Sequence, residues 1–217
     1  MYNEFTSIVA SSEQFLEEGV LDSETSLLEE YFKEKRRIFD LGTGRGRIPR
    51  YLACSGICSE IYGVDSNPNM IALANRFIHP EVAFVHEDIL SFLKREKSAS
   101  GILILGNSLG GILDETYRED MLDHMYESIT SQGVIMIDYR PMHYVINHDV
   151  IIERHQQEFG ELIVTEESFG ERKVHLCQYY PDSQRLNQWF SFHRFQINRF
   201  VPLNDSKFYR QIAILSR

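Results

Sequence analysis

A glycine-rich segment is the first part of the chain whose residue types and spacing suggest chemistry. It reads Phe39-Asp-Leu-Gly-Thr-Gly-Arg-Gly-Arg and follows a short apolar run. Gly42 allows a tight turn, Gly44 lets the backbone approach a ligand, and Gly46 lets the following helix pack close to the strand. A dinucleotide-binding loop would have its third glycine one position later, where this chain has Arg47. The bulky side chain there disfavours a pyrophosphate and so weakens the case for a nicotinamide or flavin cofactor.

Two carboxylates end the next two apolar runs. Asp65 follows Gly42 by 23 residues, a spacing at which a carboxylate accepts hydrogen bonds from ribose hydroxyls. Asp88 lies in the segment His86-Glu-Asp-Ile, where an acid can accept the exocyclic amine of an adenine while Ile89 packs on the ring. The alternative role of each acid is a helix N-cap or a loop carboxylate.

The elements that must position these residues alternate along the first two thirds of the chain. Short apolar runs predict buried strands, and the segments between them have helical periodicity. Such alternation is typical of an α/β fold, a Rossmann-like parallel sheet with flanking helices. The predicted strands are 37–42, 60–67, 82–89, 101–108 and 133–140, and the predicted helices are 23–35, 48–56, 68–78, 91–97 and 114–130.

The alternation stops after Arg140. The last third of the chain is rich in β-branched and aromatic residues with turn signals between them, which predicts a C-terminal antiparallel β cap. The predicted strands of this region are 161–169, 172–182, 186–197 and 208–216.

Composition and charge exclude several classes of function. The 217 residues contain 22 Lys and Arg against 32 Asp and Glu, a formal net charge of −10. This balance argues against nucleic acid and against an anionic membrane surface as partners. We expect a cytoplasmic protein because the chain lacks a run of 18 apolar residues and a basic leader, and its three cysteines are too few for a disulfide framework. The histidines have no metal-ligand spacing, so no metal is expected.

In combination, the motifs resemble those of class I S-adenosylmethionine-dependent methyltransferases over about residues 30–140. The resemblance implies S-adenosyl-L-methionine as cofactor and S-adenosyl-L-homocysteine as product. The glycine loop would then lie against the methionine part, Asp65 would bind the ribose and Asp88 the adenine amine. Met70 matches a position that often packs on the adenine. The implied cofactor-binding residues are Asp40, Gly42, Gly44, Gly46, Arg47, Asp65, Ser66, Met70, Asp88, Ile89 and Asn107.

Two further motifs narrow the resemblance. Gly106-Asn-Ser-Leu-Gly and Asp138-Tyr-Arg are most similar to the small-molecule methyltransferases related to glycine N-methyltransferase. The chain departs from that group at Leu109, where an aromatic residue is usual, and at Pro141-Met-His, where the group has Asn-Tyr-Asp. The chain has no Asn/Asp-Pro-Pro-aromatic motif after the predicted fourth strand. That motif is typical of enzymes that methylate nucleobase amines. A small-molecule acceptor, most simply an amine or amino-acid-like compound, is therefore expected.

In-line methyl transfer depends mainly on alignment, which is worth about 7–11 kcal/mol. The candidate catalytic residues are Asn107, Tyr139 and His143, the last being the one neutral-pH base among them. Arg140 suits either a substrate carboxylate or a structural ion pair, and Trp189 suits either a core or a lid over the substrate. The candidate substrate residues are Tyr2, Ser108, Arg140, Tyr144 and Trp189.

The sequence leaves alternatives open for the reaction and the assembly. An O-methyltransferase, a non-catalytic partner with this fold and an NAD(P)-dependent oxidoreductase are the rival functions. We expect residues 1–140 to form the cofactor-binding domain, with 1–22 as an N-terminal lid, and residues 141–217 to form the substrate cap and edge strands. Only 17 residues follow Phe200, too few for a helix and a strand pair. Either the β region completes the sheet or another subunit does, which suggests a homodimer through the cap.

Overall fold

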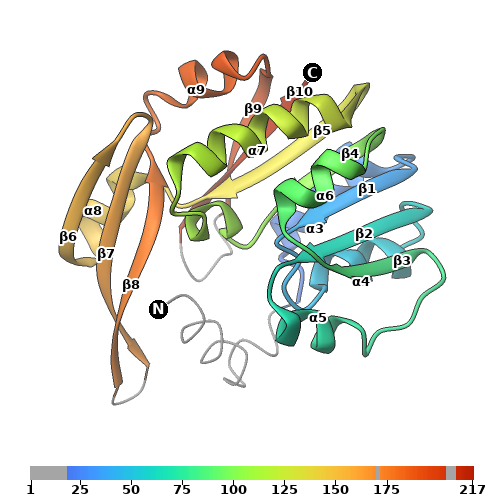
Figure 1. Ribbon diagram of the computed structural model, residues 1–217, viewed down its shortest axis with the longest axis horizontal. Coiled ribbons are helices and arrows are strands. Elements are labelled where there is room, and N and C mark those ends of the chain that lie inside the picture. The colour runs from blue at the N-terminus through green and yellow to red at the C-terminus, as the bar shows by residue number, and fades with distance from the viewer. Residues whose placement is uncertain (1–18, 170–171, 204–208) are drawn as a thin grey trace.

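A seven-stranded sheet forms the centre of the structure, a computed structural model that describes residues 19–169, 172–203 and 209–217 (Figure 1). Its strands are β1 (Arg37–Leu41), β2 (Glu60–Asp65), β3 (Val82–His86), β4 (Ala99–Ile104), β5 (Ile129–Tyr139), β9 (Gln196–Leu203) and β10 (Arg210–Ser216). They lie in the order β3-β2-β1-β4-β5-β10-β9. The first five are parallel, and β10 is antiparallel to both of its neighbours. The predicted Rossmann-like sheet is thus confirmed.

Helices cover both faces of this sheet. The helices are α3 (Asp22–Phe32), α4 (Arg47–Cys54), α5 (Pro68–Ala74), α6 (Ile89–Arg95), α7 (Glu115–Ser128) and α9 (Leu186–Phe192). Apolar side chains of α3 and α4 pack on one face, those of α6, α7 and α9 pack on the other, and α5 contacts β2 and β3. None of the helices in the described ranges is long and apolar enough to cross a lipid bilayer.

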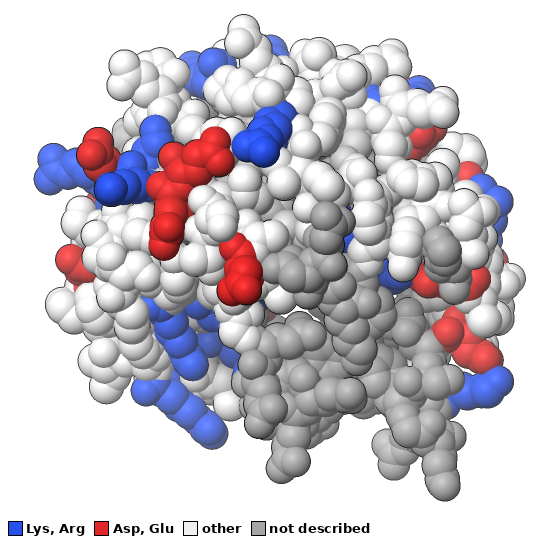
Figure 2. Space-filling model, turned by 180° about the vertical axis from the view of Figure 1, so that it is seen from behind, with Lys and Arg blue, Asp and Glu red and all other residues white. Residues whose placement is uncertain are grey.

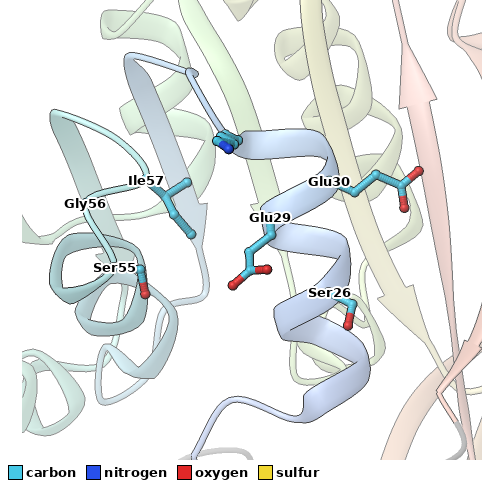
Figure 3. Close-up of a pocket in the computed structure, with 7 residues that line it drawn as sticks. Ser26, Glu29, Glu30, Ser55, Gly56 and Ile57 are labelled. Carbon is cyan, nitrogen blue, oxygen red and sulfur yellow. The ribbon is translucent and has the colours of Figure 1, made fainter.

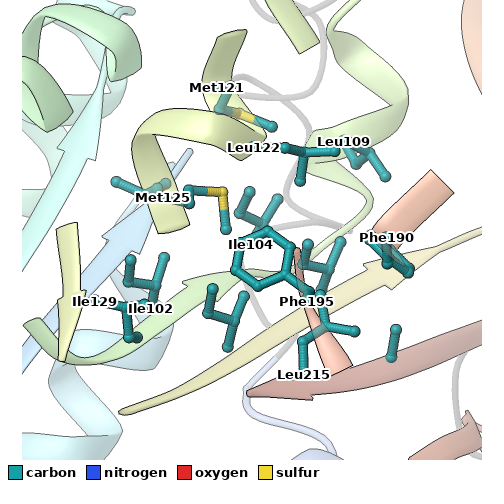
Figure 4. Close-up of a cluster of buried hydrophobic side chains, with 14 of the residues drawn as sticks. Ile102, Ile104, Leu109, Met121, Leu122, Met125, Ile129, Phe190, Phe195 and Leu215 are labelled. Atoms are coloured by element: carbon teal, nitrogen blue, oxygen red, sulfur yellow. The ribbon is translucent and has the colours of Figure 1, made fainter. Parts of the chain in front are cut away.

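The core explains why the strands are almost continuously apolar. Ile102 and Ile104 of β4 point to α7, whereas Leu103 between them points to the α3 side. Figure 4 shows Met121 and Met125 of α7 above the isoleucines of β4. A strand covered on both faces buries every side chain, and each large aliphatic residue then contributes about 1.5–3 kcal/mol of transfer free energy.

A second, smaller sheet confirms the predicted antiparallel region at residues 161–182. It consists of β6 (Val150–Gln157), β7 (Gly160–Phe169) and β8 (Arg172–Pro181), in that order. Figure 1 shows it at one end of the molecule beside α8 (Met142–His148), whose Val145 packs against Ile163 and Tyr180. Strand β8 also contacts the short 3₁₀ helix η1 (Ser108–Gly111). The small sheet therefore adjoins the loop that follows β4.

The predicted strand at 186–197 is wrong over most of its length. Residues Leu186–Phe192 form helix α9, and only the end of the segment enters β9. The aromatic residues alternate as in a strand, but Leu186, Trp189 and Phe190 also have the spacing of one helix face, and all three are buried. Phe192 falls on the opposite face and is 72% exposed. The segment folds as a helix because this conformation buries Leu186, Trp189 and Phe190 on one face.

The edge of the main sheet is completed by the chain itself. Strand β10 pairs with β5 from Gln211↔Tyr139 to Ser216↔Val134, and β9 pairs with the other side of β10. The expectation that too few residues remain was wrong because the final helix and the first strand of the pair begin before Phe200. Of the two alternatives left open by the sequence, the β region supplying the edge strands is the correct one.

His193 fixes the end of α9 to α7. Its ring is almost fully buried, with Nδ1 at 2.9 Å from Asp123 Oδ1 and Nε2 at 2.5 Å from Glu119 Oε2. Trp189 Nε1 donates to the other oxygen of Glu119 at 2.8 Å. Burial by itself lowers the pKa of His193, but the hydrogen bonds and charges of the two carboxylates outweigh it, so the pKa is raised above 6.5.

This arrangement predicts a pH-dependent stability. The pKa of His193 is higher in the folded protein than in the unfolded chain, where it is near 6.5. The contribution of His193 to the free energy of unfolding is therefore fully present below the unfolded pKa and is lost as pH rises through the folded pKa. We expect His193→Gln to lower the free energy of unfolding by about 1–2 kcal/mol at about pH 6 and by less at about pH 9. Urea unfolding at both pH values measures this. His124→Gln, a partly exposed site on α7, is the control, and an equal loss at both pH values would contradict the assignment.

Candidate functional site

The glycine-rich loop joins β1 to α4 at the carboxyl end of the parallel strands. The backbone N–H groups of Gly42 and Thr43 donate to Val64 O at 2.8 and 2.9 Å, which ties the loop to β2. At Gly46, φ is +76°, and a Cβ atom there would lie 2.5 Å from the Phe84 ring. Only glycine fits this position, because the left-handed backbone and the close approach act together. The loop is therefore fixed in one conformation.

Asp40 lies buried beneath this loop. The Thr43 hydroxyl donates to Asp40 Oδ2 at 2.6 Å. Burial raises the pKa of Asp40 to about 6, although the hydrogen bond from Thr43 and the charge of Arg47 oppose the rise. Thr43 was not among the predicted site residues, and its place in the motif was the available signal.

Asp65 connects the end of β2 to the glycine loop. Its Oδ2 accepts the backbone N–H of Gly44 at 2.8 Å, and its Oδ1 accepts the N–H of Asn67 at 2.8 Å. Burial raises the pKa of Asp65, and the two N–H donors oppose that rise. A carboxylate offers about four acceptor positions, so one from each oxygen remains for a ligand. Ser66 follows on the exposed surface.

Asp88 is the N-cap of α6, which is one of the alternative roles predicted for this acid from the sequence. Its Oδ1 accepts the N–H of Ser91 at 3.1 Å, and its Oδ2 accepts the hydroxyl of Tyr117 at 2.6 Å. The side chain is exposed, so capping does not close it to a ligand. Ile89 opens α6 half-buried, and Met70 is buried on α5.

The loop after β4 lies against the glycine loop. Ser108 Oγ is 2.8 Å from Leu105 O and 3.1 Å from Gly42 O. Asn107 has φ +60°, a left-handed conformation uncommon for a residue with a side chain. Its Oδ1 is buried and has no hydrogen-bond partner among the described residues. Strain and an unsatisfied polar atom at one residue are typical of functional sites.

Four charged side chains lie behind both loops, and we call Arg47, Glu24, Arg210 and Asp138 the buried charge chain. Arg47 contacts Glu24 through two hydrogen bonds of 2.5 and 2.8 Å. Arg210 lies 3.7 Å from Glu24 and forms an ion pair with Asp138. Asp138 accepts the N–H groups of Gly106 at 2.9 Å and Asn107 at 2.6 Å. Helix α3, the start of α4, β5 and β10 thereby converge on the loop that carries Asn107.

The protonation of this chain follows from its pairing. Burial alone would raise the pKa of Glu24, but its hydrogen bonds to Arg47 and the charges of Arg47 and Arg210 bring it below the usual value. Burial raises the pKa of Asp138 despite Arg210. Glu24 and Arg210 were not among the residues predicted from the sequence. Glu24 is an ordinary acid in the first turn of a helix and Arg210 an ordinary strand residue, so neither stands out in the sequence.

Several predicted residues lie away from these loops or are committed to other contacts. Tyr139 is 1% exposed and donates to Gln211 Oε1 at 2.9 Å. Trp189 is fully buried in the core, stacked on Phe190 and Phe159, so its core alternative is the correct one. Arg140 pairs with Asp149 at 2.8 Å, which is the structural alternative proposed for it.

The remaining predicted residues belong to α8 and to the start of the chain. His143 is exposed, with Nδ1 at 3.5 Å from Ser183 Oγ, and Tyr144 stacks on Tyr209 with ring centroids 4.8 Å apart. Tyr2 and most of the predicted lid lie outside the described residues.

A hollow of about 570 Å³ lies elsewhere, between α3 and the turn after α4 (Figure 3). It is lined by Ser26, Glu29, Glu30, Lys33, Ser55, Gly56 and Ile57. Residues Ser55 to Ile57 lead into β2, so the hollow adjoins the amino end of that strand. Ligands of open α/β sheets bind at the carboxyl ends of the strands, which favours the glycine loop over this hollow as the functional site.

Comparisons with known proteins agree with the geometry. Residues 38–133, slightly less than half of the chain, match the family described as a methyltransferase domain. This stretch contains the glycine loop, Asp65, Asp88 and the loop after β4. None of the curated proteins matches the chain.

Solved structures match over nearly the whole length. A protein from Pyrococcus horikoshii is 15% identical, with a TM-score of 0.75 over 95% of this chain and 92% of that one. An S-adenosylmethionine-dependent methyltransferase from Clostridium acetobutylicum is 15% identical, with a TM-score of 0.67 over 99% and 98%. A glycopeptide N-methyltransferase, MtfA, in complex with S-adenosyl-L-methionine is 10% identical, with a TM-score of 0.70 over 92% and 95%. At these identities the likeness shows the fold.

Proposed function

We propose that this chain is an S-adenosylmethionine-dependent methyltransferase that transfers a methyl group to a nitrogen of a small molecule. Its match to a methyltransferase domain and its fold support the proposal. The observation that carries the proposal is the contact between Asp65 Oδ2 and the N–H of Gly44 at 2.8 Å. It joins the acid proposed for the ribose to the loop proposed for the methionine part. One fixed unit would thus bind both the ribose and the methionine part of the cofactor.

The remaining cofactor contacts are assigned by their place around this unit. We assign Asp88, Ile89 and Met70 to the adenine subsite, and Ser66 to the ribose. Asp40 lies buried under the methionine end, where its carboxylate complements an ammonium group. The Arg47 guanidinium is occupied by Glu24, so we propose that Arg47 supports the cofactor loop from behind.

The chemistry requires alignment and exclusion of water. The bound cofactor supplies an electrophilic methyl group on sulfur and a neutral leaving group, so the chain needs no covalent nucleophile. Asn107 Oδ1 can accept an N–H of the acceptor amine and leave the nitrogen lone pair free, and Ser108 lies beside it. His143 is the proposed base that removes a proton from an amine entering as ammonium. Tyr139 would support the acceptor site by packing and would not transfer a proton, because its hydroxyl donates to Gln211 Oε1.

Charge supports a small acceptor over a polyanion. The chain carries a net charge of −10, and Figure 2 shows acidic and basic side chains interspersed over the described part of the rear face. A glycopeptide N-methyltransferase is among the similar structures. With the Asn107 and Asp138 motifs, this favours an amine or amino-acid-like substrate and the subgroup related to glycine N-methyltransferase.

The setting of the reaction is part of the same proposal. We assign residues 1–140 to the cofactor domain and residues 141–217 to a cap whose last two strands return to the main sheet. Tyr144 in α8, at the start of the cap, would face the acceptor side, and Arg140 would hold the cap through its ion pair with Asp149. A cytoplasmic location completes the assignment. A homodimer is not needed to complete the sheet, because β9 and β10 of the same chain supply its edge.

Calorimetric titration tests the function directly. We expect both S-adenosyl-L-methionine and S-adenosyl-L-homocysteine to bind, and methyl transfer to appear in a screen of amines, amino acids and phenols. Absence of binding of either compound at millimolar concentration would refute the proposal. Transfer confined to phenols would instead identify an O-methyltransferase.

A further inference from the structure

Tyr117 makes a contact that the cofactor assignment does not use. It lies in the first turn of α7, half-buried against the core shared with α6. Its hydroxyl donates to Asp88 Oδ2 at 2.6 Å and accepts the N–H of Leu90 at 3.3 Å. The phenol therefore bridges the carboxylate and the first turn of the helix that this carboxylate caps.

The contact fixes the plane of an otherwise exposed carboxylate. Ser91 N–H binds Asp88 Oδ1 from α6, while Tyr117 binds Oδ2 from α7. With one donor on each oxygen, rotation of the group would break at least one hydrogen bond to a charged acceptor. Two of the roughly four acceptor positions of the carboxylate are occupied, and the others keep a set direction.

The phenol keeps its donor role across the neutral pH range. Burial of Tyr117 raises the pKa of its hydroxyl, and the hydrogen bond and charge of Asp88 raise it further. A protonated Tyr117 can only support the negative charge of Asp88. The bridge is thus an independent geometric feature of α6 and α7, present whatever the pH of an assay near neutrality.

We propose that Tyr117 is a positioning residue that sets the specificity of the adenine subsite for a 6-amino purine. The inference rests on the proposed function, which assigns Asp88 to the adenine amine. A fixed carboxylate accepts the amine hydrogens of adenine and repels the carbonyl oxygen that a 6-oxopurine presents at the same place. A carboxylate free to rotate would bind the amine less well and avoid the carbonyl more easily.

Two ligands that differ at this one position test the inference. Calorimetry would compare S-adenosyl-L-homocysteine with S-inosyl-L-homocysteine on the wild-type chain, Tyr117→Phe and the control Tyr126→Phe, a second tyrosine of α7. We expect Tyr117→Phe to weaken binding of the 6-amino ligand by about three- to ten-fold and to change the 6-oxo ligand by less than about two-fold. The discrimination ratio therefore falls. Tyr126→Phe should leave it unchanged.

Each other outcome has a definite meaning. An equal loss for both ligands would reduce Tyr117 to a structural residue, and tighter binding would mean that its hydroxyl competes with adenine; either result overturns the inference. No change in the affinity for either ligand also overturns the inference, while leaving the proposed function intact. If the wild-type chain binds neither ligand, the proposed function itself fails. Phenylalanine keeps the ring in the core, and thermal unfolding verifies that the variant folds.

Discussion

Asp65→Ala should abolish measurable binding of S-adenosyl-L-methionine. The substitution removes the proposed acceptor of two ribose hydroxyls and also releases the N–H groups of Gly44 and Asn67, which the carboxylate binds at 2.8 Å. Two hydrogen bonds to a charged acceptor are worth about 3–6 kcal/mol. That corresponds to roughly a hundred- to ten-thousand-fold loss of affinity. Isothermal titration of the purified variant measures it.

The control distinguishes a ligand contact from general damage. Asp120→Ala removes an exposed carboxylate on α7 and should bind the cofactor as the wild-type chain does. Circular dichroism should show both variants folded, because Asp65 is only partly buried. Unchanged affinity in Asp65→Ala would remove the proposed ribose contact and favour a non-catalytic partner with the same fold.

Arg210→Gln should lower the free energy of unfolding more than His193→Gln does. Arg210 lies between Glu24 and Asp138, both fully buried, and it is the cation that pairs with Asp138. Its removal leaves Asp138 as an uncompensated buried charge, for which a loss of about 3–5 kcal/mol in the free energy of unfolding is expected. Urea unfolding at neutral pH measures the loss.

A charge-balanced double variant is the matched control. Arg210→Gln combined with Asp138→Asn removes one charge of each sign and leaves the Arg47–Glu24 pair intact. The double variant should therefore be more stable than Arg210→Gln alone. If the losses of Arg210→Gln and Asp138→Asn simply add, these two side chains do not interact, and their ion pair contributes nothing to the free energy of unfolding.

The parts of the fold that depend on nearby residues were predictable. Strands β1 to β5 are apolar runs of the right length, and Gly42, Gly44 and Gly46 signal a turn that only glycine permits. The edge position of Asp65 and Asp88 follows because carboxyl ends of parallel strands meet at one edge. The contact of Asp65 with Gly44 is a direct outcome of that topology.

The parts that depend on packing between distant segments were not predictable. The aromatic residues of 186–192 fit two periods, and only the core on α7 selects the helix. Glu24, Arg210 and Tyr117 are ordinary residues of their own elements and gain a role from partners far along the chain. Local patterns carry no trace of such pairing.

The position of β10 also has a consequence for biosynthesis. This strand lies inside the sheet, between β5 and β9, yet it is the last of the strands to be translated. While the nascent chain emerges, β5 has no neighbour on that side, and Glu24 and Asp138 lack the cation of Arg210 for several seconds at ordinary translation rates. The proposed cofactor site should therefore mature only after β10 has been made, and ribosome-bound chains stalled before residue 210 should be markedly more sensitive to protease than chains that include β10.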